Sequence, residues 1–258
     1  MTSSFWLQLV SNGLLTGLIV TLVNAYFKSR EPFVALEAKR RDDHLREEAR
    51  AHSEYLRPLG TAARDLIDRL RWYYDALDAQ ADAGAKSRIE HLRRSVKRLK
   101  DEQDRSRPET YLLFCNGEGV DGADAMFAFA RYFALATKTR TALPTIEWAL
   151  GRPCEDLRQA LIRAESGINQ DGLGVYETIQ RSIGHYMLGV DGVPKQYADF
   201  CDLLSGSTTY PHFLVLFDFL IQLSDKRDYQ LAAALRTLPD VESAARKLSE
   251  ERILLKAA

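Results

Sequence analysis

The sequence predicts an all-α protein with one N-terminal transmembrane helix, a helical stalk and an irregular cytoplasmic helical bundle. An uncharged apolar run lies close to the N-terminus, and apolar residues recur every three or four positions along much of the rest of the chain. No segment alternates apolar and polar residues as a strand does, and no internal repeat is present. With 258 residues, 46% of them hydrophobic and 28% charged, the chain is long enough for an anchor and one folded domain.

The anchor is predicted at residues 5–27, after a short tail at residues 1–4. The segment contains no charged side chain, and a helix of about 34 Å would cross a hydrocarbon core of about 30 Å. Trp6 and Tyr26 stand near its two ends, as interfacial aromatic residues do. Basic residues follow the segment and none precedes it. We therefore expect a single-pass protein of the cell (inner) membrane, with its N-terminus outside and its C-terminal domain in the cytoplasm.

Two other interpretations of this segment stay open. A cleaved signal peptide normally has a basic n-region, which is missing here, and a buried helix of a soluble domain is rarely uncharged over such a length. Within the segment, Gly13 and Gly17 form a GxxxG pair that Thr21 continues one turn on. Small residues on one face let membrane helices approach closely, although glycine is also common in such helices. These three residues are therefore candidates for helix pairing and self-association.

A juxtamembrane stalk is predicted at residues 28–57, followed by a cytoplasmic helical domain at residues 58–258. Pro32 permits a helix to begin just outside the membrane, and Pro58 should kink or interrupt it. Gly184, in the middle of a helical pattern, indicates close packing against a neighbouring helix. The run 213–223 is the most apolar and should be deeply buried. The helices expected in the domain lie at about 59–77, 155–168, 175–188, 195–204, 213–223 and 229–255, the last with a break near Pro239. A further helix is expected to follow a turn at 116–122 and to end at about residue 137.

A basic amphipathic helix is predicted within an insertion at residues 86–107. Seven basic residues and a single acidic one lie between positions 86 and 100. Such a helix could lie on anionic lipid, could contact nucleic-acid phosphates, or could be a solvated face paired with the carboxylates that follow it. The candidate contact residues are Lys86, Arg88, Arg93, Arg94, Lys97, Arg98 and Lys100.

Three stretches carry a family resemblance: YLRPL at 55–59 with AARDL at 62–66 and Arg69-Leu70, FARYFA at 129–134, and IQRSIG at 179–184 through Met187. In order and spacing they resemble a group of uncharacterised bacterial single-pass membrane-anchored helical proteins. The basic helix departs from the pattern of that group. The resemblance implies a membrane-anchored helical architecture, and it implies no activity because none is assigned to the group.

Strong catalytic motifs are missing, since the sequence has no Walker A loop, GxGxxG, GxSxG or HExxH. Its three cysteines, Cys115, Cys154 and Cys201, are far apart, which favours a reducing compartment over a disulfide framework. The turn at 116–122 has glycines and carboxylates but lacks the spacing of a calcium-binding loop, so it is interpreted as a cap of the following helix. We expect no metal site and no cofactor.

The best candidates for chemistry are Glu177, Arg181 and His185, which are four residues apart and stack on one face of a helix. The three side chains could hold a phosphate or support acid–base chemistry. We favour the other interpretation, an ordinary salt bridge with a histidine below it, because charge pairs on helix faces are common. HEPN-type ribonucleases separate the arginine and the histidine by four to six residues, whereas Arg181 and His185 have three between them.

The sequence therefore favours a membrane-anchored cytoplasmic helical interaction or scaffold module, oligomeric and without an evident catalytic site. Its expected partners are membrane lipids, a second copy of itself through the transmembrane helix, and an unidentified protein, with nucleic acid as a weaker candidate. The alternative is a membrane-associated effector enzyme, such as a HEPN-like nuclease of a bacterial defence or signalling system.

Overall fold

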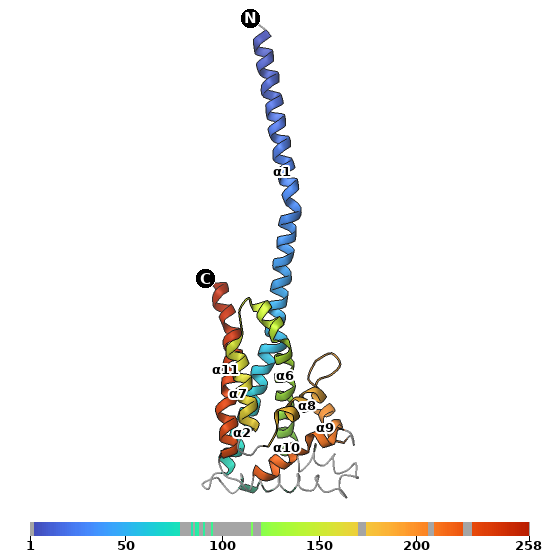
Figure 1. The fold of residues 1–258 in the computed structure, drawn as a ribbon, viewed down its shortest axis with the longest axis vertical. Helices are drawn as coiled ribbons and strands as arrows, with labels where there is room; N and C mark the ends of the chain where they lie inside the picture. Colours follow the sequence, from blue (N-terminus) through green and yellow to red (C-terminus); the bar gives the residue numbers. More distant parts are fainter. Residues whose placement is uncertain are drawn as a thin grey trace. The chain divides into compact units, whose positions relative to one another are not determined.

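The computed structural model describes residues 3–77, 120–169, 174–205, 209–223 and 229–257, with a few isolated positions between 84 and 115. Regular structure in these ranges is helical, apart from an isolated bridge between Leu188 and Pro194. The all-α fold class is therefore confirmed (Figure 1). The described helices are α1 (Ser3–Arg50), η1 (Ala51–Leu56), α2 (Arg57–Leu77), α6 (Val120–Leu150), α7 (Glu155–Asn169), α8 (Glu177–Met187), α9 (Tyr197–Ser205), α10 (Tyr210–Leu223) and α11 (Tyr229–Ala257).

Helix α1 runs without interruption through Pro32. The helix start that Pro32 permits is not used, because Pro32 lies inside this helix. A proline removes one backbone hydrogen bond, and the Ala-, Glu-, Arg- and Leu-rich sequence after it is strongly helix-forming. The side chains of residues 3–20, on which most of the predicted anchor falls, lie outside the described set, as do Gly13 and Gly17. Among the residues that are described, we find no helix with the length and apolar character needed to cross a membrane.

The α-helical pattern of hydrogen bonds changes at η1, a π-helical turn just before α2. There the N–H of Arg57 bonds to the carbonyl oxygen of His52, five residues earlier. Pro58 follows directly and has no N–H to donate to the preceding turn, and the interruption expected at Pro58 takes the form of this π-helical turn. The compact unit that contains the core begins at Arg50, and Ala51 and Leu56 are already buried in it.

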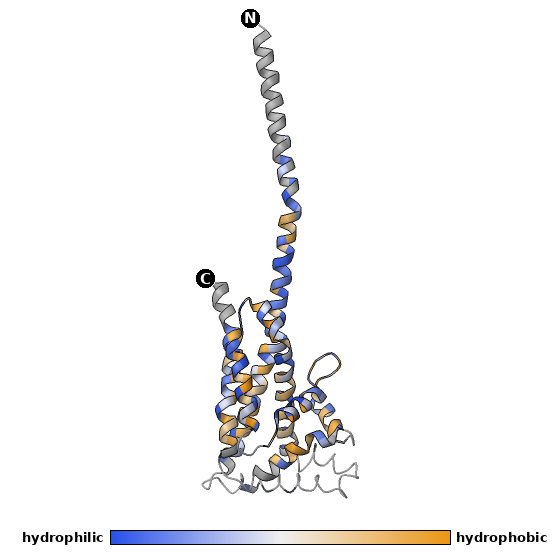
Figure 2. Cartoon of the chain, in the orientation of Figure 1, coloured by the Kyte–Doolittle hydropathy of each residue, from blue (hydrophilic) through white to orange (hydrophobic). Residues whose placement is uncertain are grey.

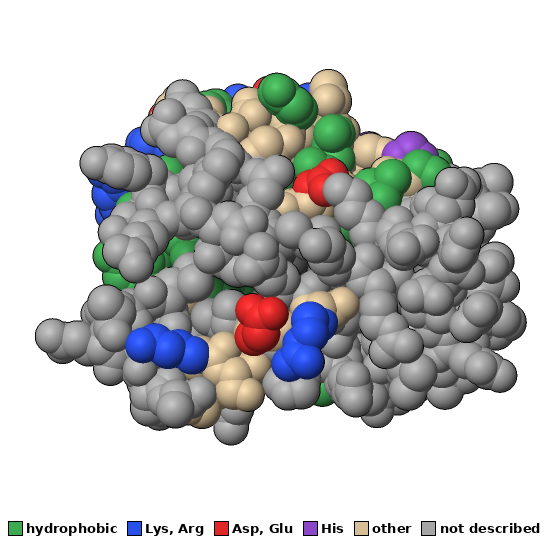
Figure 3. All heavy atoms as spheres, turned by 90° about the horizontal axis from the view of Figure 1, so that it is seen from below, with side chains coloured by type: hydrophobic (Ala, Val, Ile, Leu, Met, Phe, Trp, Pro, Cys, Tyr) green, Lys and Arg blue, Asp and Glu red, His purple; other side chains and the backbone are tan. Residues whose placement is uncertain are grey.

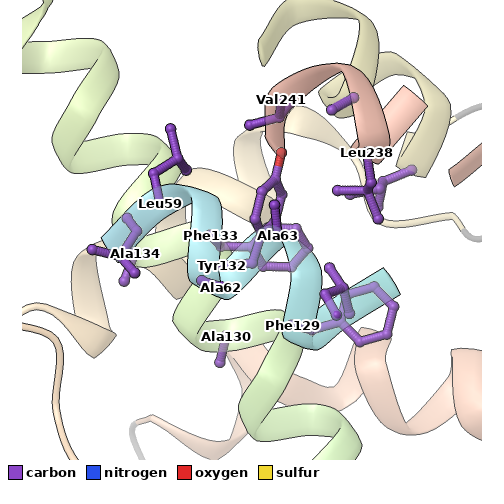
Figure 4. Packing of buried hydrophobic residues seen from close by; sticks show 14 of the residues in the cluster. Leu59, Ala62, Ala63, Phe129, Ala130, Tyr132, Phe133, Ala134, Leu238 and Val241 are labelled. Atoms are coloured by element: carbon purple, nitrogen blue, oxygen red, sulfur yellow. The ribbon is translucent and has the colours of Figure 1, made fainter. Parts of the chain in front are cut away.

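The centre of this unit consists of α2, α6 and α11. Small residues lie where α2 and α6 face each other, and Ala62, Ala63, Ala130 and Ala134 are fully buried. Alanine at such contacts allows helix axes to approach at the short end of the usual range of about 8–10 Å. Figure 4 shows the larger buried side chains gathered around these alanines, namely Leu59, Phe129, Tyr132, Phe133, Leu238 and Val241.

Helix α10 closes one end of the core with a row of aromatic residues. Its buried side chains include Phe213, Phe217 and Phe219. The ring of Phe219 meets that of Phe129 edge to face, with centroids 5.1 Å apart. Such aromatic pairs contribute roughly 0.5–1.5 kcal/mol beyond the area they bury. One face of the described part of the 213–223 run is therefore buried, while Leu214 and Val215 are only partly buried.

Two predicted helix ends are wrong. Helix α6 continues past residue 137 and through Pro144 to Leu150, and α11 passes through Pro239 without a break. A proline in a helix interior costs about 3 kcal/mol, so each helix needs compensating contacts. Buried apolar side chains next to each proline supply them, namely Leu143, Ile146, Leu238 and Val241.

Helix α8 lies directly against the backbone of α6 at Gly184. A Cβ at this position would be 2.6 Å from the carbonyl oxygen of Phe133 and 2.6 Å from Oγ1 of Thr137. No side chain fits at such distances, so the close packing predicted from this glycine is confirmed. Gly167 allows a similar approach of α7 to α11, where a Cβ would overlap Thr237.

The turn between α6 and α7 is fixed by Glu147. Its Oε1 accepts hydrogen bonds from the N–H of Cys154 at 3.1 Å and from Nη2 of Arg158 at 2.8 Å. Gly151, in the turn itself, has a φ of 66°, a left-handed conformation that favours glycine. The hydrogen bond from Cys154 is the main reason that the pKa of Glu147 is lowered, and the hydrogen bond from Arg158 lowers this pKa further.

Replacing Gly184 by alanine should destabilise the fold. Overpacking of this kind costs about 1–3 kcal/mol, because the α6 backbone cannot move away without disturbing the core. Gly60→Ala is the matched control. Its Cβ would meet that of Ala245 at an ordinary 3.6 Å, and alanine in a helix gains up to about 1 kcal/mol over glycine. Urea unfolding of both variants measures the difference, and a Gly184→Ala variant as stable as the wild type would contradict the packing described.

Removing the charge of Glu147 should destabilise the protein at neutral pH and much less in acid. A carboxyl group whose pKa is lowered on folding stabilises the fold above its ordinary pKa of about 4.3, and this contribution is lost as the pH falls through the folded-state value. We expect Glu147→Gln to lower the melting temperature by about 2–4 °C at pH 7 and to match the wild type near pH 3. Glu250→Gln, at an exposed ion pair, is the control. A difference that persists unchanged in acid would contradict this role.

Candidate functional site

The three residues singled out in the sequence lie on α8 as predicted, and two residues from other helices join them. Arg140 of α6 places Nη2 2.6 Å from Oε2 of Glu165, which belongs to α7. Nε of Arg181 lies 3.3 Å from Oε1 of the same carboxylate, and its Nη2 is hydrogen-bonded to Glu177. Glu177 is also 3.8 Å from Nη1 of Arg140. Two guanidinium groups and two carboxylates thus form one closed network, here called the charged cluster.

The charged cluster lies beside a small hollow of about 190 Å³ between α6, α7 and α8. Tyr132 and Gln180 line it together with Arg140, Arg181 and His185. Gln180 is buried and donates hydrogen bonds to the carbonyl oxygens of Glu165 and Val175, at 3.0 and 2.8 Å. Burial raises the pKa of Tyr132, whose side chain reaches this hollow from the core. The hollow is smaller than a typical ligand pocket.

The geometry of the charged cluster suits structural support better than phosphate binding. Arg181 already has carboxylates on two sides, which neutralise its charge and occupy its donors. His185 is exposed at the rim, and no hydrogen bond or ion pair joins its ring to another described side chain. A phosphate-binding arginine needs its charge available to the substrate, and Arg181 lacks this. His185 is accessible, but no described side chain orients its ring for acid–base chemistry.

Sequence inspection did not identify Arg140 and Glu165 as members of the cluster. Arg140 follows the predicted end of its helix at about residue 137, and Glu165 lies on a different amphipathic helix. No spacing rule joins residues on separate helices, so the sequence contained no signal for this contact. Glu165 is nevertheless the central member, because its side chain is only 13% exposed and contacts both arginines.

A second polar contact lies on the outer side of α8. Oγ of Ser182 is hydrogen-bonded to Nδ1 of His212 at 3.1 Å, and the ring of His212 stacks on Tyr186 with centroids 4.5 Å apart. The surrounding hollow is wide and shallow and is shared with Arg181 and His185. Ser182 is the hydrogen-bond partner of this ring among the described side chains, so no described acid orients His212 as it would in a Ser–His–Asp triad.

The remaining predicted contact residues are only partly covered by the structure. Lys86 and Arg94 are helical and exposed, and Thr21 is exposed on α1. The other basic residues of this set lie outside the described residues, namely Arg88, Arg93, Lys97, Arg98 and Lys100. Gly13 and Gly17 lie in the part of α1 whose surroundings are not described. In the space-filling view from below, the described Lys and Arg side chains stand apart and form no continuous basic patch on this face (Figure 3).

The cysteines are unsuited to nucleophilic catalysis. All three are free thiols, and Cys115 and Cys154 are buried. Burial raises the pKa of each of the three, and a hydrogen bond to Cys201 raises that of Cys115 further. A catalytic thiol requires the opposite shift. In the part of the chain that the structure describes, no group of three or more His, Cys, Asp and Glu residues is placed to hold a metal ion.

Comparison with known proteins adds no family. No protein-family model matches this sequence, and neither a curated protein nor a solved structure matches it. The function must therefore be inferred from the chain's own geometry.

Neutralising Glu165 should destabilise the bundle more than neutralising its neighbour in the same cluster. Glu165→Gln leaves two guanidinium groups with reduced pairing in a partly buried place, which costs about 1–3 kcal/mol. Glu177→Gln is the matched control, because that carboxylate is 49% exposed and such pairs contribute about 1 kcal/mol or less. Urea unfolding at pH 7 measures both. The structural role of the cluster is contradicted if Glu165→Gln costs no more than Glu177→Gln.

Proposed function

We propose that the chain is a membrane-anchored helical binding module that self-associates through its N-terminal helix and presents its bundle in the cytoplasm. The observation that carries this proposal is the separation of the chain into two units. The N-terminal unit, Met1–Ala49, consists of one helix, and the core lies entirely in the unit Arg50–Ala258. A single helix, taken by itself, has no core of its own and needs another environment to stabilise it.

For residues 5–27, the proposed environment is the lipid bilayer. The absence of charge over this length, the interfacial aromatics and the basic residues that follow support insertion with the C-terminal side in the cytoplasm. An isolated helix in water is only marginally stable, even with favourable residues. A lipid bilayer can accommodate this segment, because the backbone N–H and C=O groups of an α-helix pair with one another and need no water.

For the stalk, the proposed environment is a second copy of the chain. Residues 31–46 of α1 are all exposed, and Figure 2 shows a short apolar stretch within an otherwise mostly hydrophilic part of this helix. That stretch contains Phe33, Val34 and Leu36, which are 68%, 61% and 47% exposed. The stretch follows the proposed membrane segment closely in sequence. A second copy held nearby by its own anchor would give these exposed residues an apolar surface to pack against.

The anchor predicts where the full chain is found in cells. It should remain with the membrane fraction after an alkaline carbonate wash, and a variant lacking residues 1–27 should be released. A C-terminal fluorescent-protein fusion should be bright and a C-terminal alkaline phosphatase fusion inactive, because both reporters would be cytoplasmic. Release of the full chain by carbonate would contradict anchoring, and an active phosphatase fusion would contradict the orientation.

Self-association predicts a position-specific effect within the anchor. In a membrane two-hybrid assay of residues 1–32, Gly13→Ile and Gly17→Ile should each reduce the signal several-fold, because a branched side chain separates the helix backbones. Leu15→Ile, on a different face of the same helix, is the control and should keep the signal. Undiminished signal in both glycine variants would exclude pairing through this face.

The competing class, a HEPN-like nuclease, gains no support from the charged cluster, since Arg181 is bound to two carboxylates. The purified full chain should leave single-stranded RNA and DNA intact. If cleavage is observed, the Arg181→Ala/His185→Ala double variant decides whether α8 is responsible. Loss of cleavage in that variant would replace the binding-module proposal with the enzyme.

A further inference from the structure

A second cavity of the bundle lies away from the charged cluster. It has a volume of about 600 Å³ and is bounded by η1, α6 and the loop between α8 and α9. Pockets for small molecules are commonly about 300–1,000 Å³, so this one is of ligand size. No residue proposed above for membrane binding or self-association lines it.

One wall of the cavity is a single face of α6. Phe127, Arg131, Leu135 and Lys138 line it, and their spacing of four, four and three residues places them in one row along the helix. The row alternates apolar and basic side chains. It therefore offers both apolar contact and positive charge along the length of the cavity.

The opposite wall is the loop between α8 and α9, which is held in a defined shape. The N–H of Gly189 bonds to the carbonyl oxygen of Val193 at 2.8 Å, and the N–H of Lys195 bonds to that of Met187 at 2.7 Å. Gly192 has a φ of 71°, which allows the tight turn at the tip. Because these bonds fix the loop, the side chains of Lys195 and Tyr197 keep their places at the cavity.

The third wall is the π-helical turn, where Ser53 and Glu54 reach the cavity next to Arg50 and Pro58. Short π-helical turns are rare and occur often at functional sites, because the wider turn redirects side chains. Here the turn is a consequence of Pro58. The same proline that interrupts the helix thus contributes to the shape of the cavity.

Positive charge exceeds negative charge in this cavity. Four basic residues line it, and two acidic ones, Glu54 and Asp191, stand against them. Glu54 pairs with Arg50 at 3.0 Å, and Oδ1 of Asp191 accepts a hydrogen bond from the N–H of Val193 at 3.0 Å.

Arg131 is paired with Asp65 at 3.3 Å, so the two lysines carry the positive charge that is left over. Nζ of Lys195 donates to the carbonyl oxygen of Tyr186 at 2.8 Å, and Nζ of Lys138 lies 5.1 Å from the ring centre of Tyr55. Among the described residues, neither ammonium group has a carboxylate within ion-pair distance. This contrasts with the charged cluster, where two arginines meet two carboxylates.

Two of the residues that line the cavity, Phe127 and Tyr197, are aromatic. The rings of Phe127 and Tyr197 meet edge to face, with centroids 5.4 Å apart and an angle of 88° between the planes. Ammonium groups attract phosphate and carboxylate oxygens through charge-assisted hydrogen bonds, and aromatic walls favour flat ring systems. We propose that this cavity binds a phosphorylated small molecule with an aromatic part, of the chemistry and size of a nucleoside monophosphate.

The test is a calorimetric titration of the full chain, purified in detergent micelles, with AMP, adenosine and inorganic phosphate. AMP should bind saturably, while adenosine and phosphate, each offering half of the contacts, should bind at least tenfold more weakly. Lys138→Gln and Lys195→Gln should each weaken AMP binding at least tenfold. Lys247→Gln, an exposed lysine on α11, is the matched control and should not. Unfolding midpoints without ligand show that the variants are folded.

Three results would overturn the proposal. The first is the absence of binding heat with AMP, and the second is AMP binding that both lysine substitutions leave unchanged. The third is binding of inorganic phosphate as tight as that of AMP, which would remove the role assigned to the aromatic wall.

Discussion

The close approach of α8 to α6 at Gly184 is the contact on which much of the bundle's geometry depends. At this point the α8 backbone rests on Phe133 and Thr137 of α6, with no room for a Cβ. Arg181 lies one turn before Gly184 on the same helix, so the contact brings it to the carboxylate of Glu165. The loop after α8 begins at the same end, and it forms one wall of the large cavity. A shift of this contact would change both polar regions together.

The sequence predicted the fold class and many of the described helices because apolar residues repeat clearly along α2, α7 and α8. Gly184 was also interpretable, since a glycine in a helix needs a packing reason. Helix ends at prolines were predicted less well. Pro32, Pro144 and Pro239 all lie inside helices. Local rules penalise these positions, but buried neighbours outweigh the penalty at Pro144 and Pro239, and such neighbours become visible only in three dimensions.

The candidate site was predicted in part, for a related reason. Helical spacing placed Glu177, Arg181 and His185 on one face, but it could not supply Arg140 or Glu165 from other helices. Those two residues change the chemistry, because they convert an apparent cluster of reactive groups into a neutral network. The cavity had no sequence signal, since Lys138 and Lys195 lie on separate segments with 56 residues between them. Only the fold shows that both residues line one cavity.

The two polar regions of the bundle illustrate opposite uses of charge. In the charged cluster, guanidinium and carboxylate groups match, so the network holds α6, α7 and α8 together and leaves little attraction for a ligand. In the cavity, positive charge is left over and faces an aromatic wall. A helical bundle with one balanced and one unbalanced region fits a module that binds rather than one that reacts.

Amide hydrogen exchange on the full chain tests this account most directly. If the contact at Gly184 organises the bundle, the amides of residues 133–137 in α6 should exchange as slowly as those of residues 62–66 in α2, because both would open only on global unfolding. Fast exchange at residues 133–137 while residues 62–66 stay protected would contradict the account, since α8 could then leave α6 without unfolding the core.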